Sequence, residues 1–471
     1  MTLPTALIAM APEHALLAGI VLLLVLRVSG RGQRAALAVA LLSVAAAALC
    51  AAFLAQRGYA AVAFPGHLSV STPVLLAKAL LLALALPVLL MAQGEFDGDE
   101  FPVLLLSSLY GACLLPSVDS FLTLLLGLEI MSLPLYVLVL LAWRRPQAAE
   151  AALKYLVLGG TATAMLLMGA SLLYGATGSL AIDGFASALA AGDTLARTAA
   201  VLVVAALFLK AAIAPFHGWA PDAYEAASVP VTAFMASVVK AAVLLAAARL
   251  FAGATLASPM LELVALLPLM SIVWGNLAAM RQTSLRRLLA YSSIAHAGYL
   301  FLVFLGAPAL RTQALVFYLL AYGLMNLLAL AALPAHADDL QRDSLGTPGQ
   351  AGGDAGSLQG LYQRAPVAAL LIAVAMLSLA GLPPLPGFVA KFLIFKNLIA
   401  AGHVGYAVAG LVASFLGLYA YLRVIQVMFM AVPAGAAAQA PTRGLARVAT
   451  LACVIGALVL ALAPGWVLLR M

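Results

Sequence analysis

Long apolar blocks, each close to 20 residues and separated by short polar stretches, restrict the fold of this chain more than any other feature. A helix of about 20 apolar residues spans a bilayer, whereas a membrane β-barrel alternates apolar and polar residues in segments of about ten. The sequence shows no such alternation, and 65% of its 471 residues are hydrophobic while 9% are charged. Soluble domains carry roughly 25% charged residues. The sequence therefore predicts an all-α polytopic membrane protein and excludes a water-soluble globular one.

Fourteen candidate spans follow from these blocks, and the whole chain, residues 1–471, is expected to form a single membrane domain. The first span lacks the basic leader of a cleaved signal peptide, because no Lys or Arg precedes Arg27, and we expect it to be retained. The expected limits are 5–27, 33–54, 73–92, 101–117, 119–141, 151–175, 196–227, 229–251, 257–279, 284–305, 310–332, 366–400, 404–430 and 447–468.

Two of these spans are too long for a simple crossing and contain helix-breaking prolines. Proline removes a backbone donor and clashes with the preceding turn, and in lipid the freed carbonyls need protein or water as partners. Broken helices at membrane depth line the transport path in many transporters, although a simple packing kink is the alternative. Each break lies five residues from a lysine: Lys210 precedes Pro215, and Lys391 follows Pro386. This spacing favours a functional break; the predicted helix breaks are Pro215, Pro383, Pro384 and Pro386.

The distribution of basic residues predicts the orientation. Odd-numbered loops hold thirteen basic residues, against six in the even-numbered loops and the C-terminal tail. The positive-inside rule then places the odd loops in the cytoplasm and both termini on the periplasmic side of a bacterial inner membrane. The Gly- and Gln-rich stretch 333–365 is expected to be a cytoplasmic connector. Spans four to eight (about 101–251) and nine to thirteen (about 257–430) each contain one broken helix. Because each set has five spans, an odd number, the second set starts on the opposite side of the membrane and is predicted to be inverted relative to the first.

Ionisable residues inside the spans are the candidate functional groups. A charge at the bilayer centre costs about 2.5–3.5 kcal/mol even on the lenient insertion scale. A buried lysine can release its proton, whereas an arginine keeps it, and a moving carboxylate such as Glu129 would switch a lysine between the two states. A snorkelling or structurally paired charge is the alternative for any one residue, and we keep that interpretation for Lys78. The predicted proton path comprises Glu129, Lys154, Lys210, Lys240, His296 and Lys391.

Redox and nucleotide chemistry are not expected on this chain. Cys50, Cys113 and Cys453 all lie in apolar blocks without metal-ligand spacing, and no dinucleotide- or phosphate-binding glycine motif is present. The sequence thus predicts no catalytic redox residue, no cofactor and no metal. The net charge of +7 is attributed to membrane orientation rather than to nucleic-acid binding, because the basic residues sit mostly in loops.

Three long motifs resemble the antiporter-like subunits of respiratory complex I, and the resemblance covers nearly the whole chain. They are LFLKAAIAPFHGWAPDAYEAASVPVTAFMASVVKAAV (207–243), RQTSLRRLLAYSSIAHAGYLF (281–301) and LSLAGLPPLPGFVAKFLIF (377–395). One departure is visible, since 226–230 reads AASVP where the family often has GAPTP.

Within this family the chain is most similar to the subunit N group of bacterial NADH:quinone oxidoreductase. The central antiporter-like member carries a glutamate where this chain has Lys391, and the distal member has a long lateral C-terminal helix. The stretches YLLAYGLMNLLALA (318–331) and GNLAAMRQTSLRR (275–287) also look like subunit N.

The resemblance implies a proton-translocating membrane-arm subunit that is driven by quinone reduction elsewhere in the complex. It implies that flavin, iron–sulfur clusters and NADH belong to other subunits, and that neighbouring antiporter-like subunits and the lipid bilayer are the partners. It also implies the same six proton-path residues. A subunit of a multi-subunit cation/proton antiporter or of a membrane-bound hydrogenase stays open as an alternative. A passive scaffold would need no intramembrane Glu–Lys set, and this chain has one.

Overall fold

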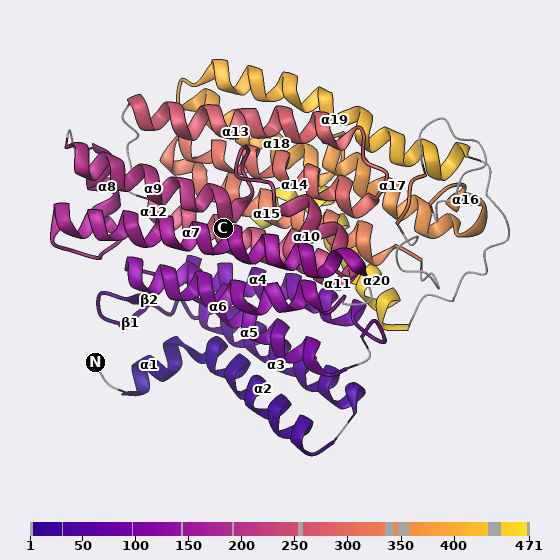
Figure 1. Ribbon diagram of the computed structural model, residues 1–471, viewed down its shortest axis with the longest axis horizontal. Coiled ribbons are helices and arrows are strands. Elements are labelled where there is room, and N and C mark those ends of the chain that lie inside the picture. The colour runs from indigo at the N-terminus through magenta and orange to yellow at the C-terminus, as the bar shows by residue number, and fades with distance from the viewer. Residues whose placement is uncertain are drawn as a thin grey trace.

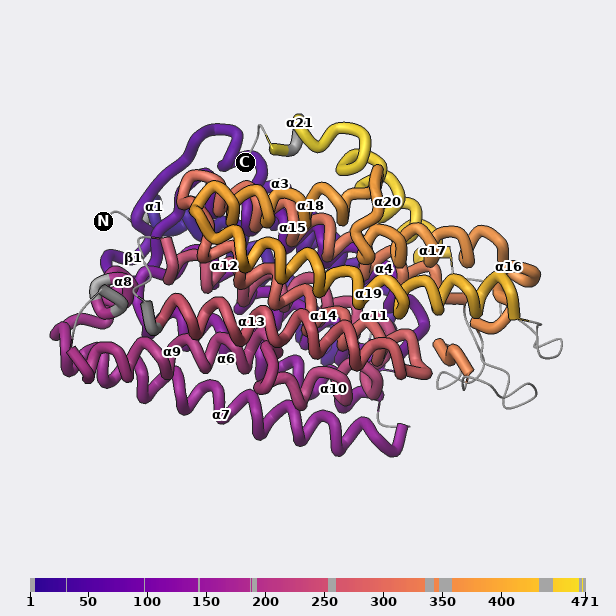
Figure 2. The backbone as a smooth tube through the Cα atoms, turned by 90° about the horizontal axis from the view of Figure 1, so that it is seen from above, coloured from indigo at the N-terminus to yellow at the C-terminus, as the bar shows by residue number. Residues whose placement is uncertain are grey.

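The computed structural model describes residues 3–30, 32–96, 98–142, 145–190, 193–252, 258–334, 343–346, 358–431 and 444–468. Within these ranges the chain is nearly all helix, with one antiparallel hairpin of β1 (Ala61–Phe64) and β2 (Leu68–Val70). Figure 1 shows the bundle extending from α2 and α3 at the lower edge to α19 at the upper edge. In the view turned by 90°, α7 lies at one edge and α3 and α20 lie near the opposite edge (Figure 2). The predicted all-α fold is confirmed.

The first half of the chain supplies the hairpin and the helices up to the first interrupted span. In chain order these are α1 (Leu3–Ala9), α2 (Ala11–Val28), α3 (Gln33–Gln56), α4 (Thr72–Met91), α5 (Glu100–Leu114), η1 (Leu115–Ser117), α6 (Phe121–Leu140), α7 (Pro146–Thr177), α8 (Asp183–Ala190), α9 (Thr194–Ala211), α10 (Ala220–Ala226), α11 (Val229–Phe234), η2 (Met235–Val239) and α12 (Lys240–Phe251).

The second half supplies the other interrupted span and the C-terminal helices. These are α13 (Ser258–Ala279), α14 (Leu285–Leu302), η3 (Val303–Leu305), α15 (Pro308–Ala331), α16 (Leu361–Arg364), α17 (Pro366–Ala380), α18 (Pro386–Ala400), α19 (Val404–Met430), α20 (Gly444–Leu462) and α21 (Pro464–Leu468).

Thirteen helices in the described part of the chain are long and apolar enough to cross a membrane. The remaining predicted span, 366–400, is covered by α17 and α18, which have 15 residues each and are too short to cross alone. Together they account for the fourteen predicted spans. The inverted relation between the two five-span sets stays a prediction, and most of the predicted connector 333–365 lies outside the described residues.

Both predicted helix breaks are present. The first interruption separates α9 from α10, and Ala212, directly after α9, has a left-handed backbone with φ of 61°. The second separates α17 from α18 and begins at Gly381 with φ of 91°, a conformation that glycine adopts without steric cost. Pro386 does not lie within the break. It is the first residue of α18, a position where proline is favoured because the first N–H of a helix has no partner.

Three helices that carry predicted site residues begin at a side-chain cap. Ser120 accepts a hydrogen bond from the backbone N–H of Thr123 at the start of α6. Asp193 accepts one from the backbone N–H of Ala196 at the start of α9. Ser284 caps α14 by accepting from the backbone of Arg287. Such caps satisfy N–H groups that a helix start leaves unpaired. They set where α6, α9 and α14 begin, and hence the height at which their inner side chains lie.

The central spans of the bundle are covered by the surrounding helices. The spans 229–251 and 285–305 have 94% of their most apolar stretch buried, and the span 308–331 has 83%. The peripheral helices α2, α3 and α20 have 28%, 28% and 22%. Lys240 and His296 are carried by the two most buried spans, so their polar atoms depend on partners from within the chain.

Candidate functional site

Glu129 on α6 and Lys210 on α9 form an ion pair inside the bundle. The Lys210 Nζ lies 3.1 Å from Glu129 Oε1 and donates a second hydrogen bond to Ser132 Oγ at 3.2 Å. Thr163 on α7 also donates to Glu129 Oε1, at 2.5 Å. The Lys210 side chain is 6% exposed and that of Glu129 is 25% exposed. The structure thus brings together an acid and a base that can exchange a proton.

Lys240 binds the end of an interrupted helix. Its Nζ donates to the carbonyl oxygen of Ala211, the last residue of α9, at 2.9 Å and to that of Ser293 at 3.2 Å. Carbonyls at the end of a helix carry the negative end of its dipole and attract a cation. A π-helical turn, Met235–Val239, ends directly before Lys240, and such turns are frequent at functional sites.

Lys391 on α18 binds the end of the other interrupted helix. Its Nζ donates to the carbonyl oxygen of Ala380, the last residue of α17, and to Ser414 Oγ, both at 2.8 Å. The same atom lies 5.2 Å from the centre of the Tyr299 ring, close enough for a cation–π contact. Lys391 also lines a largely apolar cavity of about 560 Å³ between α18 and α19.

The two interrupted helices therefore share one arrangement, in which a lysine ammonium holds the last carbonyl before the break. In the first interruption that lysine is Lys240, not Lys210, which turns instead toward Glu129. The sequence spacing pointed to Lys210 as the lysine at this break. It could not reveal the contact of Lys240, because the packing of a later helix against α9 cannot be read from spacing. Within the described residues no carboxylate pairs with Lys240 or Lys391.

His296 lies in a network of tyrosine hydroxyls. Its Nδ1 is 2.7 Å from the hydroxyl of Tyr318, and its Nε2 is 3.3 Å from that of Tyr421. The Tyr421 hydroxyl also lies 2.7 Å from Ser292 Oγ. A neutral imidazole donates through one ring nitrogen and accepts through the other, and a phenol does both. This network can hand a proton on without creating a net charge. The tyrosines were missed at sequence level, where aromatic residues in apolar spans are expected to be packing residues.

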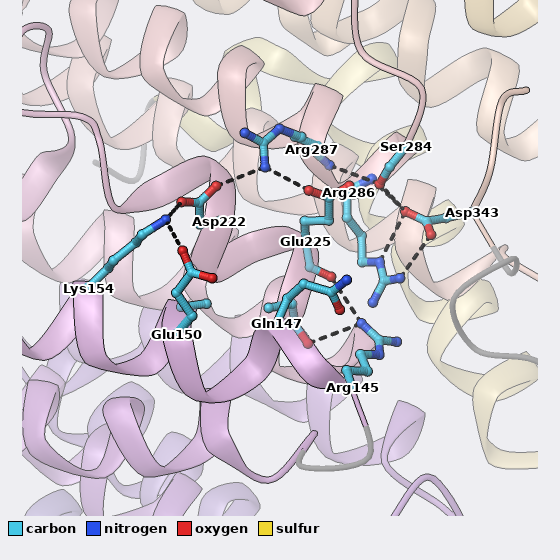
Figure 3. A pocket seen from close by; sticks show the side chains of 12 residues that line it. Arg145, Gln147, Glu150, Lys154, Asp222, Glu225, Ser284, Arg286, Arg287 and Asp343 are labelled. Carbon is cyan, nitrogen blue, oxygen red and sulfur yellow. Dashed lines mark hydrogen bonds and ion pairs between the residues drawn. The ribbon is translucent and has the colours of Figure 1, made fainter. Parts of the chain in front are cut away.

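Lys154 lies apart from these buried groups. Its side chain is 44% exposed, and its Nζ is 2.7 Å from both Glu150 Oε1 and Asp222 Oδ2. Arg287 extends the network, with Nη1 at 2.9 Å from Asp222 and 2.7 Å from Glu225 (Figure 3). These side chains line a polar pocket of about 320 Å³ at the ends of α7, α10 and α14. We refer to it as the polar pocket.

The opposite wall of the polar pocket is a buried arginine–aspartate pair. Arg286 donates to both carboxylate oxygens of Asp343, through Nε at 3.0 Å and Nη2 at 2.9 Å, as Figure 3 shows. The Arg286 backbone N–H donates to the same carboxylate at 2.8 Å. Burial alone would raise the pKa of Asp343, but the Arg286 charge and these hydrogen bonds outweigh it and hold that pKa below its usual value. This wall keeps its charges at neutral pH.

Lys78 has a partner that the sequence did not reveal. Its Nζ lies 2.6 Å from Glu13 Oε1, and both side chains are fully buried between α2 and α4. The two residues are far apart in the chain, and Glu13 stands at the start of the first span, where an acid is usual at a helix N-terminus. The structural interpretation of Lys78 is consistent with this contact. No group of His, Cys, Asp or Glu residues in the described ranges has the arrangement of a metal site.

Known proteins match the chain over most of its length. The family described as NADH:quinone oxidoreductase/Mrp antiporter, TM, matches residues 118–417. A NADH-quinone oxidoreductase subunit N from Pelobacter propionicus is 38% identical over 426 residues, which cover 90% of this chain and 89% of the relative. A chain in the structure of respiratory complex I from Thermus thermophilus with bound aureothin is 38% identical, with a TM-score of 0.82 over 97% of this chain and 98% of that one. A chain of the Mrp complex from a Dietzia species has a TM-score of 0.84 but 22% identity, over 100% of this chain and 96% of that one, and so shares the fold.

Proposed function

Because the chain belongs to the NADH:quinone oxidoreductase and Mrp antiporter family, in its subunit N group, we propose that its buried ionisable residues move protons across the membrane. It is an antiporter-like membrane-arm subunit of a bacterial NADH-quinone oxidoreductase, and other subunits of that complex are its partners. The oxidation of NADH and the reduction of quinone take place on other subunits, and the chain itself carries neither flavin nor iron–sulfur cluster. Its own part in the reaction is proton transfer.

The observation that carries this proposal is the attachment of a buried lysine to the end of each interrupted helix. Lys240 is held by two carbonyl oxygens and Lys391 by one carbonyl and one hydroxyl oxygen, and neither has a paired carboxylate within the described residues. Such a lysine can lose its proton without leaving an unpaired carboxylate behind. A purely structural buried lysine is expected to have a counter-ion, as Lys78 does.

The buried ionisable residues are connected to one another through the backbone and side chains of the helices that they share. Lys210 precedes Ala211, whose carbonyl binds Lys240, and Lys240 also binds the carbonyl of Ser293 on the helix that carries His296. Tyr299, one turn further along that helix, contacts Lys391. Water molecules bridging the gaps would complete the path. Movement of Glu129 toward or away from Lys210 would change the proton affinity of the first lysine and start the transfer.

Lys154 is proposed to serve this path from the polar pocket rather than from within the bundle. The pocket is built at helix ends next to odd-numbered loops, which the excess of basic residues assigns to the cytoplasm. The same assignment places both termini in the periplasm. The two five-span sets are proposed to be inverted repeats, each with its interrupted helix as the fourth span.

An ion/proton antiporter is less well supported. The Mrp chain shares the fold at 22% identity, whereas the complex I chain is 38% identical over nearly the full length. The composition of the native complex separates these functions. Co-purification with flavin and iron–sulfur subunits supports the proposal, whereas a complex of membrane subunits alone would support the antiporter.

Substitution of the lysines tests the proton path itself. Arginine keeps the positive charge but does not deprotonate, so Lys210→Arg and Lys391→Arg separate a relay from a structural charge. For a relay, the arginine and the alanine variants should both lose proton uptake in proteoliposomes that contain the assembled complex. Near-normal uptake in the arginine variants, beside clear loss in Lys210→Ala and Lys391→Ala, would assign both residues a structural role.

A further inference from the structure

Three aromatic side chains pack together beneath the polar pocket. The rings of Tyr136 and Tyr155 meet edge to face with centres 4.8 Å apart, and the Tyr155 ring stacks on Trp219 at 4.2 Å. They come from α6, α7 and the interruption before α10, and all three are buried. We call these three residues the aromatic plug.

The aromatic plug lies between the polar pocket and the Glu129–Lys210 pair. On the pocket side, Tyr155 directly follows Lys154. On the other side, the Trp219 indole N–H donates to the carbonyl of Leu209, the residue before Lys210, at 2.9 Å. Tyr136 follows Glu129 by seven residues on α6, which places both on the same face about 10 Å apart along the axis. The residues of the plug therefore adjoin both the polar pocket and the ion pair.

The Tyr136 hydroxyl is a polar atom of the plug whose surroundings single it out. It is buried and has no hydrogen-bond partner among the described residues. Burying a hydroxyl unpaired costs about 1–3 kcal/mol, so a phenylalanine would fill this position more favourably if packing were its only role. Ser132, one turn earlier on α6, accepts a hydrogen bond from Lys210. Tyr136 therefore lies one turn along α6 from a partner of Lys210.

A glycine on the neighbouring helix makes room for this hydroxyl. A Cβ added at Gly159 on α7 would lie 2.0 Å from the Tyr136 hydroxyl oxygen. Gly159 stands between Lys154, which lines the pocket, and Thr163, which donates to Glu129. Along α7 these two neighbours are about 7 Å and about 6 Å away. The hydroxyl therefore sits roughly midway between the pocket lysine and the partner of Glu129.

We propose that the Tyr136 hydroxyl is a proton-relay group that connects the polar pocket with the Glu129–Lys210 pair, and that the aromatic plug otherwise closes this route. The phenol oxygen accepts a proton from a water molecule on the pocket side. Its own O–H proton passes to a water molecule or hydroxyl on the Glu129 side. Rotation of the O–H about the Cζ–O bond then restores the starting orientation of the hydroxyl. No net charge forms on the tyrosine, because one O–H bond forms as the other breaks. This inference rests on the proposed function and names its proton inlet.

Two substitutions with matched controls test the relay. Tyr136→Phe removes the hydroxyl and keeps the ring, and its control is Tyr174→Phe at an exposed tyrosine on α7. Gly159→Ala displaces the hydroxyl, and its control is Gly160→Ala, where an added Cβ meets no atom within 4 Å. Proton uptake is measured in proteoliposomes with the assembled complex and normalised to subunit content. Loss of a proton-transfer group lowers a rate on the order of 100-fold, so both test variants should fall by that order while both controls stay at the wild-type rate.

Assembly and pumping of the variants together distinguish a structural role of Tyr136 from a relay role. If Tyr136 only packs, Tyr136→Phe should assemble and pump normally. If Tyr136→Phe fails to assemble, the comparison of Gly159→Ala with Gly160→Ala decides, since both leave Tyr136 in place. Equal pumping in each test variant and its control, in a complex whose Lys210→Ala variant does not pump, would overturn the relay and leave the proposed function standing. Normal pumping by Lys210→Ala as well would instead reject the proposed function.

Discussion

Replacing Glu129 with glutamine removes the negative charge from the buried pair but keeps the size of the side chain and an acceptor for Thr163. The charged atoms of Glu129 and Lys210 are 3.1 Å apart. Two unit charges at that distance attract by about 5 kcal/mol at an effective dielectric constant of about 20. Because a quarter of the Glu129 side chain is exposed, screening is expected to halve this attraction to about 2–3 kcal/mol.

That energy sets the size of the expected defect. Each 1.36 kcal/mol corresponds to a factor of ten in a protonation equilibrium, so the loss of 2–3 kcal/mol weakens the binding of the proton to Lys210 by roughly 30- to 150-fold. We expect proton pumping by Glu129→Gln complexes to fall in the same proportion, to roughly 1–3% of the wild-type rate. Quinone reduction should slow as well, because the two processes are coupled.

The assay is proton uptake by proteoliposomes during quinone reduction, normalised to the amount of assembled complex. Glu262→Gln is the matched control, since Glu262 is an exposed glutamate on α13. It should pump like the wild type. A fully assembled Glu129→Gln complex that pumps at the wild-type rate would refute the argument that this charge controls Lys210.

Two further predictions concern stability and cofactors. Glu13→Leu leaves the fully buried Lys78 ammonium without its counter-ion, which costs about 3–5 kcal/mol. The subunit should therefore assemble poorly, and the double variant Glu13→Leu/Lys78→Leu should restore assembly. A Glu13→Leu variant as stable as the wild type in thermal unfolding would contradict this prediction. The purified chain should bind no flavin, haem, iron–sulfur cluster or NADH, as measured by absorbance and metal content, and stoichiometric iron or flavin would count against the assignment of redox chemistry to other subunits.

The sequence was sufficient to predict the span number and the two interruptions. In lipid every backbone N–H and C=O must be satisfied within its own helix, so a crossing requires a continuous apolar stretch of fixed length. Proline acts on its own helix as well, and the breaks at Pro215 and Pro383 were therefore visible without any knowledge of packing. Pro386 shows the limit of that argument, because the same residue type also begins a helix.

Tertiary structure alone decided which charges meet. Lys210 turned toward Glu129 and left the broken end of α9 to Lys240, while Lys154 faces a polar pocket and Lys78 pairs with Glu13. Hydropathy records how deep a residue lies in the membrane but not which side of its helix faces which neighbour. That choice depends on how side chains from distant spans fit together at van der Waals contact, and only the packed bundle determines it.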